Sequence, residues 1–220
     1  MDNREYEFTY ESCAIENNSY TLQETIDAIA EGKRVPDKSD REFQEIVNHH
    51  KAFDYICDLS RKSLKDLKLD DILAIHKILL KDINNEEAGK LRKVNVRVGD
   101  PELRFPNWTL VPRIMNRFMQ WLNLGKITAP LAPENMFLTE IDPLTFAAEA
   151  HSNFVLIHPF IDGNGRMARL IMNLVLLNKG KYFAIIRKKD REHYFASIKT
   201  TLENRGCADP FKALMESGME

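Results

Sequence analysis

Apolar residues at helical spacing, divided by helix-capping signals, constrain the fold of this chain more than any other feature. Thr21 and Ser39 each begin a capping box with a glutamate three residues later, and Asp142-Pro143 combines a cap with a first-turn proline. Between such signals, apolar side chains recur every three or four positions, as on one face of a helix. The sequence therefore predicts a mostly α-helical fold, with helices over about 21–32, 39–57, 69–83, 111–125, 142–157, 166–178 and 190–204.

One stretch departs from the helical period. Val94, Val96 and Val98 alternate with polar residues, and the turn-forming sequence Gly-Asp-Pro follows them. This pattern predicts a short strand or β-hairpin, whose exposed edge can accept an extended peptide as an added strand. A connecting loop is the alternative, because an isolated hairpin is only marginally stable.

The overall composition is typical of a soluble globular protein. The 220 residues are 44% hydrophobic and 29% charged, with a formal net charge of −2, and so near-neutral a balance argues against a general nucleic-acid partner. The N-terminus lacks the apolar core of a signal peptide, and the most apolar stretch, residues 170–177, is too short to cross a membrane. We expect a cytoplasmic protein without nucleic-acid or membrane partners.

The length predicts one domain with an appendage. Val35-Pro36-Asp37 has the composition of a linker, which divides the chain into an N-terminal segment, residues 1–37, and a helical domain, residues 38–220.

A close pair of glycines is conspicuous because glycine is scarce in this chain. Gly163 and Gly165 flank Asn164 between two predicted helices, so the three residues form a tight loop that leads into a helix N-terminus. Backbone amides in such a loop bind anions, and the helix dipole adds to the attraction. Arg166 and Arg169 share a helix face beside the loop, and the arginine fork matches phosphate oxygens. Together these features suggest a polyphosphate ligand.

Two neighbouring residues add to this chemistry. Asp162 is a hard oxygen ligand of the kind that binds Mg²⁺ together with substrate phosphates, and His158 can take a proton from an attacking hydroxyl group. Taken singly, such residues have plainer explanations, since Asn-Gly marks a turn, a lone histidine packs in a core and an arginine pair faces solvent. Because all of them fall within residues 158–169, the sequence indicates phosphoryl or nucleotidyl transfer.

The same segment resembles a family signature. Residues 158–169 meet every specified position of H-P-F-x-[DE]-G-N-G-R-x-x-R, the motif of Fic-domain proteins, and the order of helices is similar from about residue 66 to residue 210. The resemblance implies a Fic-like helical bundle with a short β-hairpin flap over the active site. It also implies transfer of AMP from ATP, with Mg²⁺, to a Ser, Thr or Tyr hydroxyl of a target protein.

The resemblance further implies a role for each matching residue. His158 would deprotonate the target hydroxyl, and Asp162 would hold Mg²⁺. The residues implied to bind the nucleotide are Gly163, Asn164 and Gly165 around the phosphates, Arg166 and Arg169 at the β- and γ-phosphates, Tyr194 and Phe195 beside the adenosine, and Val96, Arg97, Val98 and Gly99 in the flap. Leu202 stands where relatives can carry a polar residue facing adenine, which leaves the selectivity for this base open.

A shorter match lies near the N-terminus. Ser12, Glu16 and Asn17 fit the inhibitory motif of the family, [ST]-x-x-x-E-[GN], in which the glutamate pairs with the second motif arginine, here Arg169. Residues 1–37 would then carry an inhibitory helix, and residues 38–220 the catalytic domain. The plainer alternative is a helix with an exposed glutamate.

Several alternatives stay open. Glu16 can instead orient a water molecule on an AMP-modified protein, which would make the chain a deAMPylase, or the chain is a nucleotide-regulated binding module without turnover. Auto-modification, a homodimer and transfer of another nucleotide such as UMP are also open. His151 shares a predicted helix face with His158 and can support it, although packing in the core is the simpler expectation for this and the other histidines.

Overall fold

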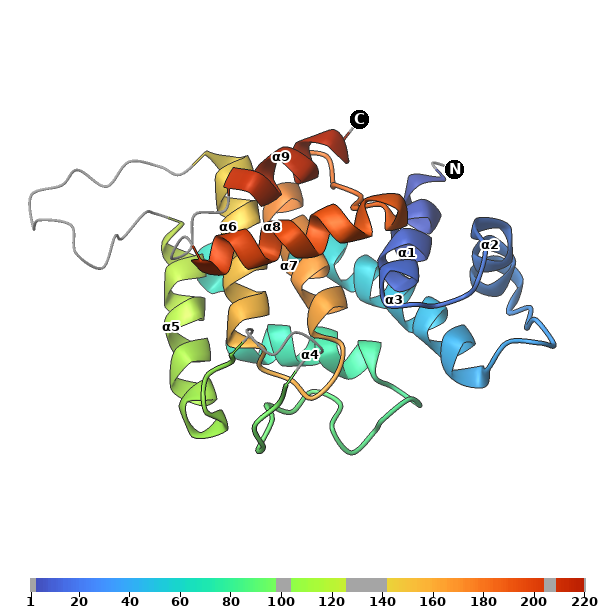
Figure 1. Ribbon diagram of the computed structural model, residues 1–220, viewed down its shortest axis with the longest axis horizontal. Helices are drawn as coiled ribbons and strands as arrows, with labels where there is room; N and C mark the ends of the chain where they lie inside the picture. Colours follow the sequence, from blue (N-terminus) through green and yellow to red (C-terminus); the bar gives the residue numbers. More distant parts are fainter. Residues whose placement is uncertain (1–2, 98–103, 126–141, 204–208, 220) are drawn as a thin grey trace, which may run out of the picture.

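Helices α6 (Pro143–Ile157) and α7 (Asn164–Asn178) lie side by side in the centre of the molecule, and residues 158–163 connect them (Figure 1). The structure is a computed structural model that describes residues 3–97, 104–125, 142–203 and 209–219. Most side chains of α7 are buried. Within it, the side-chain amide of Asn173 donates to the Ala184 carbonyl through its nitrogen and accepts from the Ala184 backbone N–H through its oxygen. The glycine loop therefore leads into a helix that is fixed in the core.

Other helices surround this central pair. Helices α3 (Asp40–Leu59) and α4 (Leu69–Leu79) pack on each other, and α5 (Val111–Leu124) packs against α6. Helices α8 (Arg191–Glu203) and α9 (Asp209–Ser217) cross over α6 (Figure 1). Short 3₁₀ turns precede three of these helices, at Leu64–Asp66, Trp108–Leu110 and Lys188–Asp190.

The N-terminal helices α1 (Arg4–Ile15) and α2 (Leu22–Glu31) both pack on α3 (Figure 1). Phe8 and Ile15 of α1 belong to the same hydrophobic core as α7. Helix α2 covers a smaller apolar cluster, which consists of Cys13, Tyr20, Ala28, Phe43 and Ile46. Helix α1 thus packs directly on the helices that position the glycine loop, and a domain boundary at residue 37 stays a prediction.

The helix ends follow the predicted capping signals. Thr21 and Ser39 form the expected capping boxes, and Asp142 caps α6. Two features differ from the prediction. Helix α4 ends at Leu79 rather than near residue 83, and Asp82 beyond this end adopts a left-handed conformation (φ 59°). Helix α9 follows α8 as a helix that the sequence did not predict.

The mostly α-helical fold is confirmed, but the predicted strand is not seen. The described ranges contain no β-strand, and residues 94–97 form a loop; Val98 and Gly99 lie outside these ranges. A side chain of this loop contacts the chain that follows it: the Trp108 backbone N–H donates to Asn95 Oδ1 (2.9 Å). No helix in the described part of the chain is long and apolar enough to span a bilayer.

Candidate active site

The loop between α6 and α7 is braced by one of its own side chains. His158 (φ 47°) and Gly163 (φ 77°) both adopt the left-handed conformation, one at each end of the loop. Asn164 Oδ1 accepts from the Phe160 backbone N–H (3.0 Å), and Asn164 Nδ2 donates to the Phe160 carbonyl (2.9 Å). The oxygen and the nitrogen of this buried side-chain amide each make a hydrogen bond within the loop, so the side chain of Asn164 holds the loop in shape.

His76 of α4 contacts the same loop through a hydrogen bond and a ring stack. The Gly89 backbone N–H donates to His76 Nδ1 (3.0 Å), so Nε2 carries the ring proton and donates to the Asp162 carbonyl (3.1 Å). The ring stacks on Phe160 with 3.5 Å between centroids. Burial lowers the pKa of His76 to about 4, which keeps the ring neutral and this arrangement intact at neutral pH.

His158 is held as a neutral proton acceptor. Its Nδ1 donates to the Val155 carbonyl (3.4 Å), which leaves Nε2 as the acceptor, and its ring stacks on Phe105 with 4.1 Å between centroids. Burial is the main reason why the pKa of His158 falls to about 4; Arg92 lowers it further, against opposing effects of Val155 and Glu16. The imidazole is therefore uncharged at neutral pH.

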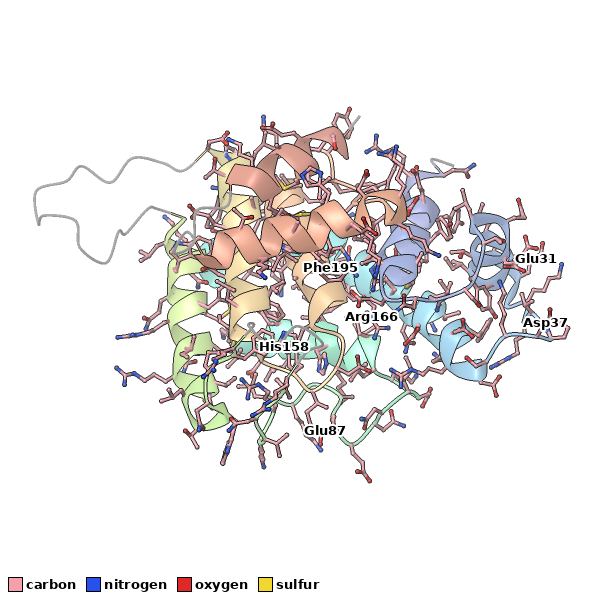
Figure 2. The ribbon with its side chains drawn as sticks, in the orientation of Figure 1. Glu31, Asp37, Glu87, His158, Arg166 and Phe195 are labelled. Carbon is pink, nitrogen blue, oxygen red and sulfur yellow. The ribbon has the colours of Figure 1, made fainter. Side chains whose placement is uncertain are left out.

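A cavity of about 250 Å³ brings the predicted residues together. Figure 2 shows His158 and Arg166 at this loop. The cavity is lined by Glu16, Arg41, Glu45, His158, Ile161, Asp162, Gly163, Asn164, Gly165 and Arg166. The residues predicted from the 158–169 motif thus share one site with the predicted inhibitory glutamate, except that Arg169 does not line the cavity and contacts this site through Glu16.

Asp162 is an ionised carboxylate in this cavity. Its Oδ1 accepts from the Gly163 backbone N–H (2.6 Å), and its Oδ2 accepts from Arg41 Nη2 (2.6 Å). Burial alone would raise the pKa of Asp162, but Arg166, Arg41 and the Gly163 N–H outweigh burial and lower it. The side chain is 38% exposed, so it can reach a ligand in the cavity.

Arg166 is buried without sufficient partners. It is 3% exposed, and its Nε and Nη1 atoms have no hydrogen-bond partner among the described residues. Two carboxylates lie nearby, Glu45 Oε1 at 3.4 Å from Nη1 and Asp162 Oδ1 at 3.6 Å from Nη2. A buried guanidinium with unused donors is suited to an anion that enters the cavity.

In contrast to Arg166, Arg169 has a hydrogen-bond partner at each of its three side-chain nitrogen atoms. Nε donates to Ser12 Oγ (2.9 Å), and Nη2 donates to the Ser12 carbonyl (2.7 Å) and to Glu16 Oε1 (2.8 Å). Nη1 donates to the hydroxyl of Tyr194 (3.1 Å), which also lies 2.8 Å from His151 Nε2. Ser12 and Glu16 of the predicted inhibitory motif therefore both contact Arg169, and an inhibitory effect of these contacts stays a prediction.

The end of α1 explains the residue types of this N-terminal motif. Glu16 is the last residue before Asn17, which adopts the left-handed conformation (φ 70°), and the Asn17 N–H donates to the Ala14 carbonyl (3.1 Å). Glycine and asparagine enter this conformation more readily than other residues. A Cβ on Gly165 would collide with Glu16 Oε1, so glycine at this position leaves room for the Glu16 carboxylate beside Arg169.

The remaining predicted site residues have different surroundings. Tyr194 is 1% exposed and lies behind Arg169, whereas Phe195 is half-exposed on α8 (Figure 2). Val96 is half-buried and Arg97 exposed, while Val98 and Gly99 lie outside the described residues. His151 is buried and stacks on Phe211, which fits the expected core position. A contact of Tyr194, Phe195 or the flap residues with a nucleotide stays a prediction.

Two charged residues that line this cavity were not predicted from the sequence. Arg41 and Glu45 come from α3, where Arg41 Nε donates to Glu45 Oε1 (3.2 Å), and Asn18 Nδ2 donates to Glu45 Oε2 (3.1 Å). Opposite charges four residues apart are typical of an exposed helix face, so the pattern contains no signal for a site. Only the packing of α3 against α7 brings them to the cavity.

Comparison with known proteins relates this site to one family. A model of the Fic/DOC family matches residues 66–176. Protein adenylyltransferase fic-1 of Caenorhabditis elegans is 34% identical over 205 residues, which cover 93% of this chain and 37% of that protein. Protein adenylyltransferase Fic of Nematostella vectensis is 35% identical over 206 residues, which cover 94% of this chain and 45% of that protein. The chain spans less than half the length of these relatives.

Solved structures share the fold. Fic-1 from Caenorhabditis elegans superposes with a TM-score of 0.84 at 30% identity, over 100% of this chain and 61% of that one. A Fic domain containing signaling protein from Bacteroides thetaiotaomicron reaches a TM-score of 0.84 at 23% identity, over 99% of this chain and 83% of that one, and supports the fold alone. The family match includes the loop and both helices that form the site, and the chain therefore belongs to the Fic/DOC family.

Proposed function

We propose that this chain is a protein adenylyltransferase, which transfers AMP from ATP to a hydroxyl group of a target protein and is inhibited by Glu16. The observation that carries the proposal is the buried guanidinium of Arg166, whose unused donors lie beside a loop of backbone amides. Such a pair attracts a multiply charged anion. The names of the relatives, protein adenylyltransferases, favour AMP as the transferred group.

His158 supplies the base for this reaction. Neutral Nε2 takes the proton of the target hydroxyl while the hydroxyl oxygen forms a bond to the α-phosphorus of ATP. The bond from that phosphorus to its bridging oxygen breaks, and pyrophosphate leaves with the electron pair. The imidazolium then returns its proton to solvent.

The donor set around Asp162 fits Mg²⁺. The carboxylate is ionised, and each oxygen accepts one hydrogen bond, which leaves lone pairs for a cation on the cavity side. One carboxylate together with substrate phosphates is a common set of ligands for Mg²⁺. When bound, Mg²⁺ neutralises charge on the phosphates that leave.

Inhibition follows from the occupation of Arg169. Glu16 and Ser12 use the donors that a γ-phosphate would need, and the carboxylate places negative charge at the same point. ATP then lacks the partner that holds its terminal phosphate, so its α-phosphorus is not aligned for attack. Removal of the carboxylate frees one donor of Arg169 and opens this space.

The test compares the wild-type chain with Glu16→Gly and with Glu16→Gly/His158→Ala. Each is incubated with Mg²⁺, ATP labelled with ³²P at the α-phosphate, and a cell lysate, and labelled proteins are identified by mass spectrometry. We expect Glu16→Gly to increase labelling by roughly tenfold or more. We expect the double variant to bind ATP without labelling any protein, because it lacks the base.

Two outcomes would contradict the proposal. If Glu16→Gly binds ATP but labels nothing, itself included, the chain is a nucleotide-binding module without turnover. If the double variant still labels, His158 is not the base. Mass spectrometry also distinguishes AMP from UMP and identifies the modified residue type.

A second candidate function uses the same cavity in the reverse direction. Glu16 is bound to Arg169 through Oε1 alone in the described contacts and lines the cavity with His158, so its carboxylate can orient a water toward an AMP-modified side chain. Release of AMP from an AMP-modified protein would then require Glu16, whereas AMP transfer does not. Incubation of wild type and Glu16→Gly with such a substrate distinguishes the two directions. A homodimer stays a prediction.

A further inference from the structure

Arg92 is among the largest fully buried side chains in the described part of the chain, and it lies in no helix. It is 1% exposed, and no described carboxylate lies within ion-pair distance of it. Its Nε donates to the His158 carbonyl (2.8 Å), Nη1 to the Val94 carbonyl (2.8 Å) and Nη2 to the Pro106 carbonyl (2.6 Å). Its own backbone N–H donates to the Pro159 carbonyl (2.9 Å).

Burial of this cation opposes folding unless its geometry provides a compensating gain. Burial lowers the pKa of Arg92, yet a guanidinium keeps its charge in proteins. Three carbonyl oxygens replace the missing counter-ion, in directions that match the planar fork of a guanidinium. A lysine carries its three donors on a single nitrogen and cannot reproduce this planar fork, and an apolar residue of equal size has no donor at all.

The three carbonyl groups belong to parts of the site that are distant in sequence. His158 is the candidate base at the end of α6. Val94 and Pro106 stand at the two ends of the segment that contains the predicted flap and Phe105. One side chain therefore connects the catalytic loop to both ends of the segment beside it.

The orientation of His158 depends on these contacts in two ways. Its backbone is left-handed (φ 47°), a conformation that costs a residue with a Cβ free energy, and the bond from Arg92 Nε holds its carbonyl. Its ring stacks on Phe105, whose neighbour Pro106 is bound to the same guanidinium. Backbone and ring are thus both positioned relative to Arg92.

We propose that Arg92 is a positioning residue for the transfer reaction. It orients His158 so that Nε2 faces the cavity, and it holds both ends of the segment that carries the predicted flap. Its role in turnover rests on the proposed function, whereas its effect on His158 in the free protein does not.

The first experiment measures the titration of the His158 imidazole by NMR in the free protein. The signal is identified by its absence in His158→Gln. Among the described residues, the charged groups that act on this ring are Arg92 and Glu16. We expect the wild-type ring to titrate near pH 4 and the ring in Arg92→Met to titrate at higher pH, closer to the ordinary value of about 6.5. Arg92→Lys keeps the positive charge but not the fork, and we expect a smaller shift.

The second experiment measures kinetics in the Glu16→Gly background. Arg92 does not line the cavity, so we expect the Kd for ATP to change much less than kcat when it is replaced by Lys or Met. We expect kcat to fall by roughly 100-fold, as for a reacting group displaced by about 1 Å.

Asn173→Ala is the matched control. Asn173 is also buried and also bonds two backbone groups, but both belong to Ala184, away from the loop. We expect this variant to lose stability without any change in the His158 titration or in kcat.

The proposal is overturned if the Arg92 variants behave like Asn173→Ala, with lower stability but a wild-type His158 titration and kcat. It is also overturned if neither Arg92→Met nor Arg92→Lys folds, since Arg92 then serves the whole fold. If no variant transfers AMP in the Glu16→Gly background, the proposed function fails, and the NMR titration still decides the role of Arg92.

Discussion

Two arginines three positions apart on α7 differ in how their donors are used. Arg169 is fully buried and bonded to Ser12, Glu16 and Tyr194, whereas Arg166 keeps unused donors beside the cavity. Removing one partner from a buried hydrogen-bonded charge usually costs more than the bond itself contributes, because the remaining group stays desolvated. We infer that Glu16 takes the place proposed for a phosphate and keeps Arg169 satisfied in the free protein.

A prediction at this scale concerns Gly165. A Cβ at this position would collide with Glu16 Oε1 and lie 3.3 Å from Arg169 Nη1, so Gly165→Ala should separate the ion pair. We expect amide hydrogen exchange of residues 12–17 to accelerate roughly tenfold in the free protein, because the end of α1 opens more often.

Gly180→Ala is the control for this variant. Unlike the helical Gly165, Gly180 has a positive φ (68°), but no atom lies within 4 Å of a Cβ built there, so this variant adds backbone strain without a collision. Unchanged exchange over residues 12–17 in Gly165→Ala would show that the pair tolerates the extra methyl group.

At the scale of elements, α1 is held in place by apolar packing as well as by Arg169. The ring of Phe8 is 1% exposed and packs against His49, Phe53 and Phe183, with centroids 5.0, 5.2 and 6.0 Å apart. Helix α1 packs on α3 and α7 but supplies neither the 158–163 loop nor its flanking helices, so its packing can be lost while α6 and α7 stay folded. Inhibition should therefore depend on contacts remote from the phosphate site.

The corresponding prediction is that Phe8→Ala activates the protein. Truncation of a buried phenylalanine costs about 3–5 kcal/mol, and here the loss falls on the docking of α1. We expect AMP transfer to rise toward the level of Glu16→Gly although Glu16 is intact, as measured by incorporation of labelled AMP.

Leu22→Ala is the control for Phe8→Ala, because Leu22 is exposed on α2 and its truncation removes little packing. If Phe8→Ala loses stability but stays as inactive as wild type, α1 remains docked without its largest apolar contact, and the prediction is wrong.

At the scale of the whole molecule, neutral histidines are buried throughout the core. The pKa values of His49 and His151 lie well below the ordinary value, chiefly because of burial, and those of His76 and His158 fall to about 4. His49 Nε2 and His151 Nδ1 have no hydrogen-bond partner among the described residues, so a second ring proton would be buried unpaired. Acid should therefore destabilise the fold before most carboxylates titrate.

The predicted pH dependence follows from these lowered pKa values. The unfolded chain protonates its histidines near pH 6.5, the folded chain only near pH 4 or below, so stability falls as pH decreases between these values. We expect each buried histidine to cost on the order of 1–2 kcal/mol in the free energy of unfolding between pH 7 and pH 5. Urea denaturation at both pH values measures the change.

His193→Asn is the control for this experiment, because it removes a histidine that is exposed rather than buried in the core. Equal stability at pH 7 and pH 5 would contradict the prediction.

Local sequence signals predicted the helices and the order of groups in the loop. A capping box spans four residues, and the His158–Arg169 motif spans one loop and one helical turn, so near neighbours alone determine these structures. The strand or hairpin predicted from Val94, Val96 and Val98 is not seen at residues 94–97, because alternation of valines is a local signal whereas a strand also needs a partner; Val98 and Gly99 lie outside the described residues.

The rest of the site depends on contacts between distant residues. Arg92, Arg41 and Glu45 reach the loop only because the fold brings separate segments together, and their own neighbours in sequence carry no sign of it. The side-chain contacts of Asn164 were not predicted either. Its position in the motif predicts a contact with phosphate, whereas its side chain is hydrogen-bonded within the loop.

The order of the amino acids is enough to predict the chemical groups of this site, because the glycine loop, the carboxylate, the imidazole and the two arginines lie within a single short segment. Which of those groups already have hydrogen-bond partners within the protein depends on the tertiary structure. Whether a guanidinium is free or paired depends on burial and on partners from other helices, and sequence distance does not encode either quantity. That difference leaves Arg166 with unused donors and Arg169 bound to α1.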